Sequence, residues 1–270
     1  MSAKKQSWLE RNWPFRHTEV KLNNDTNLIK LVAMITMLID HLGAVVFPQY
    51  RVMRIIGRIA FPIYAYCIAV GCVYTRNIGK YLQRLVLLAL IVQPLYVYVM
   101  DHTVYMMTSV DFSQYPLKAI WYYYLYSWKD PSILLTLTVG VAAIWSLRER
   151  KLLVTLLILI TVYMHDSFYD YGVRGVILML LMYAFIDRWY ISLPVVAGYM
   201  LYWGLKGYGY NTFGVVYGIQ TFALLSLPFI YIPMHTGIKL NKWVFYAYYP
   251  AHLLVVLAAK HWDSILALIK

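Results

Sequence analysis

The sequence predicts an all-α fold: a polytopic integral membrane protein whose helices form one bundle. Of its 270 residues, 61% are hydrophobic and only 13% are charged, against about 25% charged residues in a soluble domain. The apolar residues lie in long runs, and short clusters of Lys and Arg separate these runs. This pattern is typical of membrane helices joined by basic loops, and it excludes a water-soluble fold.

The net charge of +12 does not indicate nucleic-acid binding. A nucleic-acid-binding module carries its Lys and Arg on one face of a soluble domain, with aromatic residues among them. Here the basic residues are divided among short segments between apolar runs. We therefore expect membrane lipids and no nucleic acid as partners.

Residues 1–27 are predicted to form a basic cytoplasmic arm, and residues 28–270 a single transmembrane domain. The arm is polar and contains several Lys, Arg and aromatic residues. It lacks the short apolar core and small-residue cleavage site of a signal peptide. It either lies along the inner membrane surface or is a solvated tail that only fixes the topology.

We expect about nine transmembrane helices, within a range of about 8 to 11, because a hydrocarbon core of about 30 Å needs about 20 apolar residues. The apolar runs occupy residues 28–47, 53–73, 81–100, 132–147, 152–164, 172–186, 191–205, 213–232 and 242–259. The fourth to seventh runs are short for a span. The longest connection, residues 101–131, is rich in Tyr and Trp, which predicts an interfacial or re-entrant segment.

The basic residues predict a cytoplasmic N-terminus. With that orientation, the inner segments hold 15 of the 24 Lys and Arg residues, as the positive-inside rule requires. An odd number of spans then places the C-terminus outside. Most acidic and His residues fall on the outer side, so polar chemistry is predicted to face outward.

Four ionisable residues mark the first hairpin, residues 28–76, as the predicted reaction centre. Asp40 and His41 lie near the outer end of its first helix, and Arg54 and Arg58 near the outer end of its second. Ionisable side chains inside a membrane cost several kcal/mol and are functional candidates by default. Arg54 and Arg58 share a helix face, whereas Asp40 and His41 point about 100° apart. We expect Asp40 to pair with an Arg and His41 to face a cavity.

His41 has the chemistry of a general base. A neutral imidazole with a pKa near about 6.5 can take a proton from an amine or alcohol at physiological pH. The alternative is a structural cluster of Asp, Arg and His that only locks the hairpin. Nearby, Pro62 is expected to leave a carbonyl without its helical partner, which a membrane tolerates only where another donor or a wet cavity is present.

The two cysteines, Cys67 and Cys72, are predicted to be buried apolar residues. They lie five residues apart in one apolar run, so they occupy different helix faces. We expect neither a disulfide nor a metal site from them.

A set of motifs covers most of the chain from Asn27 onward. It comprises LIDHLGA at residues 38–44, RIIGRIAFPIYAY at 54–66, DPSILLTLTVG at 130–140, DYGVRG at 170–175 and YAYYPAHL at 246–253. This combination resembles the TraX family of bacterial membrane acetyltransferases. That family is also similar to heparan-alpha-glucosaminide acetyltransferase and other transmembrane acyltransferases. One departure is Asp130, which stands where the family pattern would have Asn.

The resemblance implies a multi-pass enzyme of the bacterial inner membrane that uses acetyl-CoA to acetylate an amine, the family's named acceptor being a pilin N-terminus. It places His41 at the catalytic position. We assign Asp40 and Arg58 to the same catalytic site, where they would orient the reactants and polarise the thioester carbonyl. Two alternatives remain: acetylation of a hydroxyl or amine of a surface glycan, or a transporter or channel that uses the same cluster as a proton relay or gate.

Six residues are predicted to bind substrates. They are Arg54, Asp130, Asp170, Arg174, Tyr249 and His252. His252 falls near the middle of the last helix, where it either lines the donor channel or is a hydrogen-bonded structural residue. Asp170 and Arg174 form either an acceptor-binding mouth or a pair at a helix start. Asp130 precedes a proline and would otherwise cap a helix.

Two inner basic clusters are predicted to bind the phosphates of coenzyme A. Their members are Arg76, Lys80, Arg84, Arg148, Arg150 and Lys151. The alternative is that these residues only anchor the topology. The sequence has no glycine-rich phosphate loop. A homodimer is also compatible with this sequence.

Overall fold

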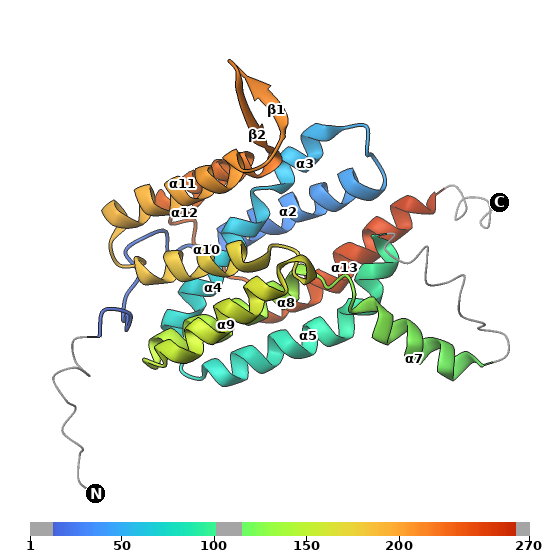
Figure 1. Cartoon of the computed structure of the whole chain (residues 1–270), viewed down its shortest axis with the longest axis horizontal. Coiled ribbons are helices and arrows are strands. Elements are labelled where there is room, and N and C mark those ends of the chain that lie inside the picture. The colour runs from blue at the N-terminus through green and yellow to red at the C-terminus, as the bar shows by residue number, and fades with distance from the viewer. Residues whose placement is uncertain (1–12, 101–114, 263–270) are drawn as a thin grey trace, which may run out of the picture.

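A computed structural model describes residues 13–100 and 115–262, which are mostly helical. The helices pack into one bundle around α4 (Ala60–Tyr74), as Figure 1 shows. α4 contacts α2 (Thr26–Val45), α8 (Ile133–Arg148) and α10 (Gly172–Ala184). A helix that is apolar on every face belongs in the centre of a bundle. Its two cysteines are buried and unpaired, as predicted.

The predicted second span is broken in two. α3 (Arg51–Gly57) ends at Gly57, and α4 begins at Ala60. Pro62 has no N–H to donate to the carbonyl of Arg58, so the regular helical ladder cannot pass this point. The amides of Arg58 and Ile59 instead donate to carbonyls three residues back, at 3.1 and 3.2 Å. The break lies at the charged cluster of the first hairpin.

A second proline shapes α5 (Ile78–Val99). Pro94 frees the carbonyl of Leu90 within this helix, and the hydroxyl of Tyr124 donates to that carbonyl at 3.3 Å. The hydroxyl of Tyr123 donates to the carbonyl of Pro94 at 2.7 Å. Both tyrosines belong to α7 (Pro116–Ser127), which packs on α5. Within the Tyr-rich connection, residues 101–114 lie outside the described residues.

Three segments are long and apolar enough to span a membrane in the described chain: Thr26–Val45, Arg51–Tyr74 and Ile78–Val99. α9 (Leu152–Met164), α11 (Trp189–Leu205) and α13 (Lys242–Lys260) coincide with three further predicted runs. α13 packs against both α2 and α5. A membrane-embedded helical bundle agrees with this arrangement, while the count of nine spans and the cytoplasmic N-terminus stay predictions.

The eighth predicted span is wrong at its start, and the fold is not purely helical. β1 (Gly209–Thr212) and β2 (Val215–Gly218) form an antiparallel hairpin that projects from the bundle (Figure 1). Phe213 and Gly214 both have positive φ, 52° and 80°, as a two-residue type I′ turn requires. η2 (Ile219–Ser226) and α12 (Leu227–Tyr231) follow the hairpin. A short 3-10 helix, η1 (Asp166–Phe168), precedes α10.

The described part of the predicted arm, residues 13–25, is packed against the bundle and is not a separate tail. Val20 and Leu22 are buried in the main core. The indole of Trp13 donates to the carbonyl of Leu147 at 3.0 Å. Asn23 donates through its side chain to Phe229, at 2.7 Å. This segment therefore fastens the ends of several helices, and residues 1–12 lie outside the described residues.

Candidate active site

The predicted ion pair at the first hairpin is present, and it involves both arginines. Arg54 Nη1 lies 2.6 Å from Asp40 Oδ2, and Arg58 Nη2 lies 2.7 Å from Asp40 Oδ1. One carboxylate thus holds two guanidinium groups side by side. Arg58 also reaches the hydroxyl of Tyr171 at 3.5 Å. These contacts join α2, α3 and the start of α10 at one end of the bundle.

Gly57 allows this arrangement. A Cβ atom at this position would overlap the side chain of Asp40. The close approach of α3 to α2 therefore requires the absence of a side chain here, and it places Asp40 directly between the two arginines.

His41 is paired with the second predicted membrane histidine. Its Nδ1 lies 2.9 Å from Nε2 of His252, and the two rings are stacked with centroids 5.0 Å apart. Both imidazoles are buried. From the sequence, His41 was predicted as a base and His252 separately as a residue of the donor channel. The structure brings them into one unit across α2 and α13.

Hydrogen bonding assigns the protons of this pair. Nδ1 of His252 lies 3.2 Å from the carbonyl oxygen of Tyr248, and a carbonyl can only accept, so this nitrogen carries the hydrogen. Nε2 of His252 is then the acceptor, and Nδ1 of His41 is the donor. Nε2 of His41 consequently carries an unprotonated lone pair. The hydroxyl of Tyr248 donates to the carbonyl of Met34, which holds α13 against α2 at this level.

The charged cluster and the imidazole of His41 line a cavity of about 90 Å³, which we call the outer cavity after the topology predicted from the sequence. Its lining includes Asp40, His41, Arg54, Arg58, Tyr96, Asp170 and Tyr171. The ring of Tyr171 stacks on Phe61 with centroids 3.8 Å apart, which forms one wall. His41 therefore faces a cavity, as expected from the sequence, with cationic and anionic groups beside it.

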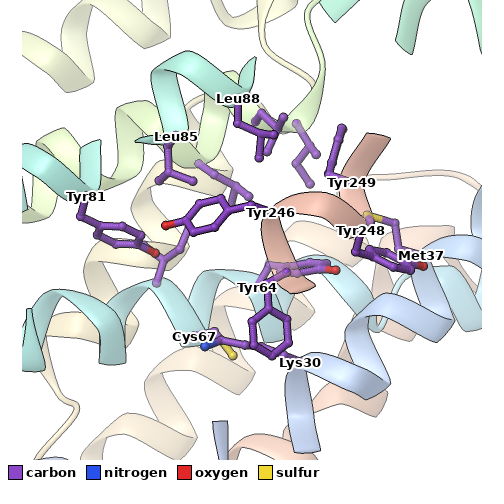
Figure 2. A pocket seen from close by; sticks show the side chains of 15 residues that line it. Lys30, Met37, Tyr64, Cys67, Tyr81, Leu85, Leu88, Tyr246, Tyr248 and Tyr249 are labelled. Carbon is purple, nitrogen blue, oxygen red and sulfur yellow. The ribbon is translucent and has the colours of Figure 1, made fainter. Parts of the chain in front are cut away.

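A second cavity, of about 170 Å³, lies among α2, α4, α5, α8 and α13, and we call it the inner cavity after the same predicted topology. Figure 2 shows its tyrosines, which come from α4, α5 and α13, together with Lys30 and Cys67 on one side. Met37, Tyr64 and Ile133 line both cavities. The two cavities are therefore neighbours separated by these shared side chains. Tyr249 lines the inner cavity and makes an edge-to-face contact with His252.

The other predicted substrate-binding residues are spread out. Asp170 lines the outer cavity, whereas Arg174 is exposed on α10. α10 begins only at Gly172, so the two residues do not share a helix face. Asp130 is exposed and does not cap α8, because Ser132 is the residue before the first helical turn. The carbonyl of Asp130 accepts instead from the buried side chain of Gln93 at 3.0 Å.

The residues of the predicted coenzyme A clusters line neither cavity. Arg76, Lys80, Arg84 and Lys151 are exposed. Arg148 donates to the carbonyl of Cys72 at 2.7 Å, so it caps the end of α4, and Arg150 lies over the ring of Trp13. Arg76 and Arg148 share a shallow surface pocket. Arg148 and Arg150 therefore have structural contacts within the bundle.

Lys30 is a cavity residue that the sequence reasoning counted only as part of the basic arm. The available signal was its position: it lies inside the first apolar run, two residues after the start of the predicted span. A lysine inside a membrane segment is costly, so either polar groups surround its ammonium or its charge has a function. No cluster of three or more His, Cys, Asp or Glu that would suit a metal ion occurs in the described ranges.

The comparisons with known proteins agree with the motifs. The family model "TraX protein" matches residues 25–259. This chain belongs to the TraX family. The match includes α2, α3, α4 and α13, which supply every residue of the ion pair and of the histidine pair. The family and the long apolar helices together identify a membrane protein.

Two curated relatives match shorter stretches. The uncharacterized protein RP591 of Rickettsia prowazekii is 46% identical over 43 residues, 16% of this chain and 17% of that protein. A probable fimbrial assembly protein FimC, serogroup H1, of Dichelobacter nodosus is 34% identical over 73 residues, 25% of this chain and 30% of that protein. The chain thus spans less than a third of the length of these relatives. No solved structure matches this chain.

Proposed function

We propose that this TraX-family protein is a membrane-embedded acetyltransferase that moves an acetyl group from acetyl-CoA to an amine. The observation that carries the proposal is the His41–His252 pair, at 2.9 Å, at the wall of a cavity that also holds two arginines. The pair leaves Nε2 of His41 as a proton acceptor. A buried, neutral imidazole held by a second group is the arrangement of a general base.

The reaction proceeds by direct transfer. Nε2 of His41 takes a proton from the neutral amine as its nitrogen attacks the thioester carbonyl carbon. The carbon–sulfur bond of the resulting tetrahedral intermediate then breaks. The thiolate of coenzyme A takes the proton back from His41, and the products are an N-acetylated acceptor and free coenzyme A. His252 accepts the Nδ1 hydrogen bond of His41 throughout and fixes its tautomer.

Asp40 has a positioning role in this proposal. It binds both arginines and thereby holds two cations beside the imidazole. Cations fixed where negative charge develops stabilise an oxyanion without reorganisation during the reaction. Arg58 and Arg54 are therefore assigned to the developing charge on the thioester carbonyl oxygen.

The acceptor is proposed to be the N-terminal amine of a pilin. The motif resemblance carries this assignment, and the fimbrial assembly relative of Dichelobacter nodosus supports it. The protein would lie in the bacterial inner membrane with about nine spans and a cytoplasmic N-terminus. Acetyl-CoA would enter from the cytoplasm and the acceptor from outside.

The test measures acetyl transfer by the purified protein in lipid nanodiscs. Release of free coenzyme A and acetylation of a pilin N-terminal peptide are followed for wild type, His41→Ala and His165→Ala. His165 is a matched control because it is exposed and its Nδ1 contacts the carbonyl four residues earlier, as in His252. We expect a loss of about 10²- to 10⁴-fold for His41→Ala and no loss for His165→Ala.

Three outcomes decide among the possible roles. Equal turnover by His41→Ala and wild type would remove His41 from the chemistry. Transfer to a glycan acceptor but not to the peptide would change the acceptor and keep the reaction. Substrate movement across sealed vesicles without any acetyl transfer would replace the enzyme by a transporter.

A further inference from the structure

We propose that the inner cavity binds the pantetheine arm of the acyl donor, with Lys30 at one end holding the donor's phosphate groups. This inference rests on the proposed function and adds a donor site at residues outside the predicted basic clusters. It combines three observations: a charged side chain at the cavity, a pair of buried hydroxyls beside it with one hydrogen to spare, and the position of the cavity beside His41.

Lys30 is a cation without a carboxylate partner in the ranges that the structure describes. Every ion pair there involves other residues. Its ammonium lies 4.8 Å from the ring centroid of Phe245, and both residues line the inner cavity. An unpaired ammonium beside an apolar cavity is a site for an anionic group. The diphosphate of coenzyme A is such a group.

The inner cavity has the lining that a pantetheine arm needs. Its walls are mainly aliphatic and aromatic, as the tyrosines, Leu85 and Leu88 in Figure 2 show. Its volume of about 170 Å³ is several times the ~30 Å³ that one water occupies in the liquid. An acetyl group alone would fill only part of it. A flexible arm with methylene groups and two amides would fill more.

Two buried hydroxyls meet beside this cavity, those of Tyr249 and Ser132. In the described residues each has only the other as a hydrogen-bond partner. One of their two hydrogens therefore has no acceptor among the described residues, and a ligand can supply one. A carbonyl of the donor arm would accept from Tyr249 here. The ring of Tyr249 touches His252, so this end of the cavity adjoins the proposed base.

The distance along α2 fits the same assignment. Lys30 and His41 are 11 residues apart on this helix, which corresponds to about 16 Å at 1.5 Å per residue. Met37, between them, lines both cavities. A donor with its phosphates at Lys30 would direct its thioester past Met37 toward His41, where the acceptor amine arrives from the outer cavity.

The test measures direct binding of coenzyme A and of pantetheine, which lacks the diphosphate, by isothermal titration calorimetry on the full chain in nanodiscs. Lys30→Gln is compared with wild type, with Lys30→Arg and with Lys206→Gln. Lys206 is a matched control because its ammonium also lies over an aromatic ring, that of Tyr202 at 5.4 Å. We expect Lys30→Gln to weaken coenzyme A binding about 10- to 100-fold and to leave pantetheine binding unchanged. Lys30→Arg should restore most of the affinity, and Lys206→Gln should behave as wild type.

The outcomes separate this inference from the proposed function. Coenzyme A binding that depends on Lys30, without any acetyl transfer by wild type, would retain the donor site and overturn the transferase. Acetyl transfer by wild type with equal coenzyme A affinity in Lys30→Gln would overturn the donor site alone. No binding of coenzyme A to wild type, or an equal loss for pantetheine and coenzyme A, would also overturn it. Thermal unfolding of each variant, measured alongside, identifies a general loss of folding.

Discussion

Removing the carboxylate of Asp40 is expected to destabilise the protein far more than removing Arg54. The side chains of Asp40 and Arg58 are 11% and 12% exposed, whereas Arg54 is 34% exposed. Asp40→Asn removes the carboxylate that is hydrogen-bonded to the buried Arg58 cation, which costs about 3 to 5 kcal/mol. Arg54→Gln removes the more accessible partner while Arg58 still neutralises Asp40. Its cost is about 1 kcal/mol or less.

These costs convert into melting temperatures. A change of 1 kcal/mol shifts the Tm by about 2 to 4 °C in chains of roughly this size. We expect a decrease of roughly 6 to 20 °C for Asp40→Asn and of about 4 °C or less for Arg54→Gln. Circular dichroism during heating in one detergent measures both.

The double variant Asp40→Asn/Arg58→Met provides the control. It removes the carboxylate and its most buried cation together, so no unpaired charge stays buried, and it should be more stable than Asp40→Asn alone. The reasoning fails if Asp40→Asn melts within 2 °C or so of Arg54→Gln, or if the double variant is the least stable of the three.

Two further predictions concern packing and pH. Gly57→Ala places a methyl group against the side chain of Asp40, so we expect a lower Tm and lower acetyl transfer. Gly198→Ala, with no atom within 4 Å of the new methyl group, should keep both, and equal behaviour of the two variants would contradict the close approach. Burial lowers the pKa of His17 below its usual 6.5, although Asp187 partly raises it. The folded state therefore favours the neutral form of His17. Its contribution to the free energy of unfolding is complete above the unfolded pKa of 6.5, and it is lost as the pH falls through the lowered folded pKa. The Tm of wild type should therefore fall between about pH 7 and pH 5 more steeply than that of His17→Gln, with His261→Gln as the exposed control.

Apolar periodicity and spacing predicted the parts of the fold that depend on local sequence. The runs at residues 28–47 and 81–100 correspond to α2 and α5 within a few residues. The positions of Arg54 and Arg58 on one helix face predicted that Asp40 would pair with an Arg, and the structure shows that both take part. These features follow from composition and helix geometry alone.

Features that depend on distant contacts were not predicted. The hairpin at Gly209–Gly218 was also missed although it is local, because its turn and second strand fall in the apolar run at residues 213–232, which was assigned to a helix. The packing of residues 13–25 depends on partners such as Leu147 and Phe229, far along the chain. The pairing of His41 with His252 likewise depends on how α13 sits against α2, which no local pattern contains.

The distance between the two histidines along the chain has a consequence for biosynthesis. They are separated by 211 residues, and His252 belongs to the last described helix. A ribosome adds residues from the N-terminus, and earlier segments enter the membrane first. The imidazole of His41 therefore lacks its hydrogen-bond partner, His252, until nearly the whole polypeptide has been made. Under the proposed function, an incompletely inserted chain would lack the complete histidine pair and would not yet use the donor.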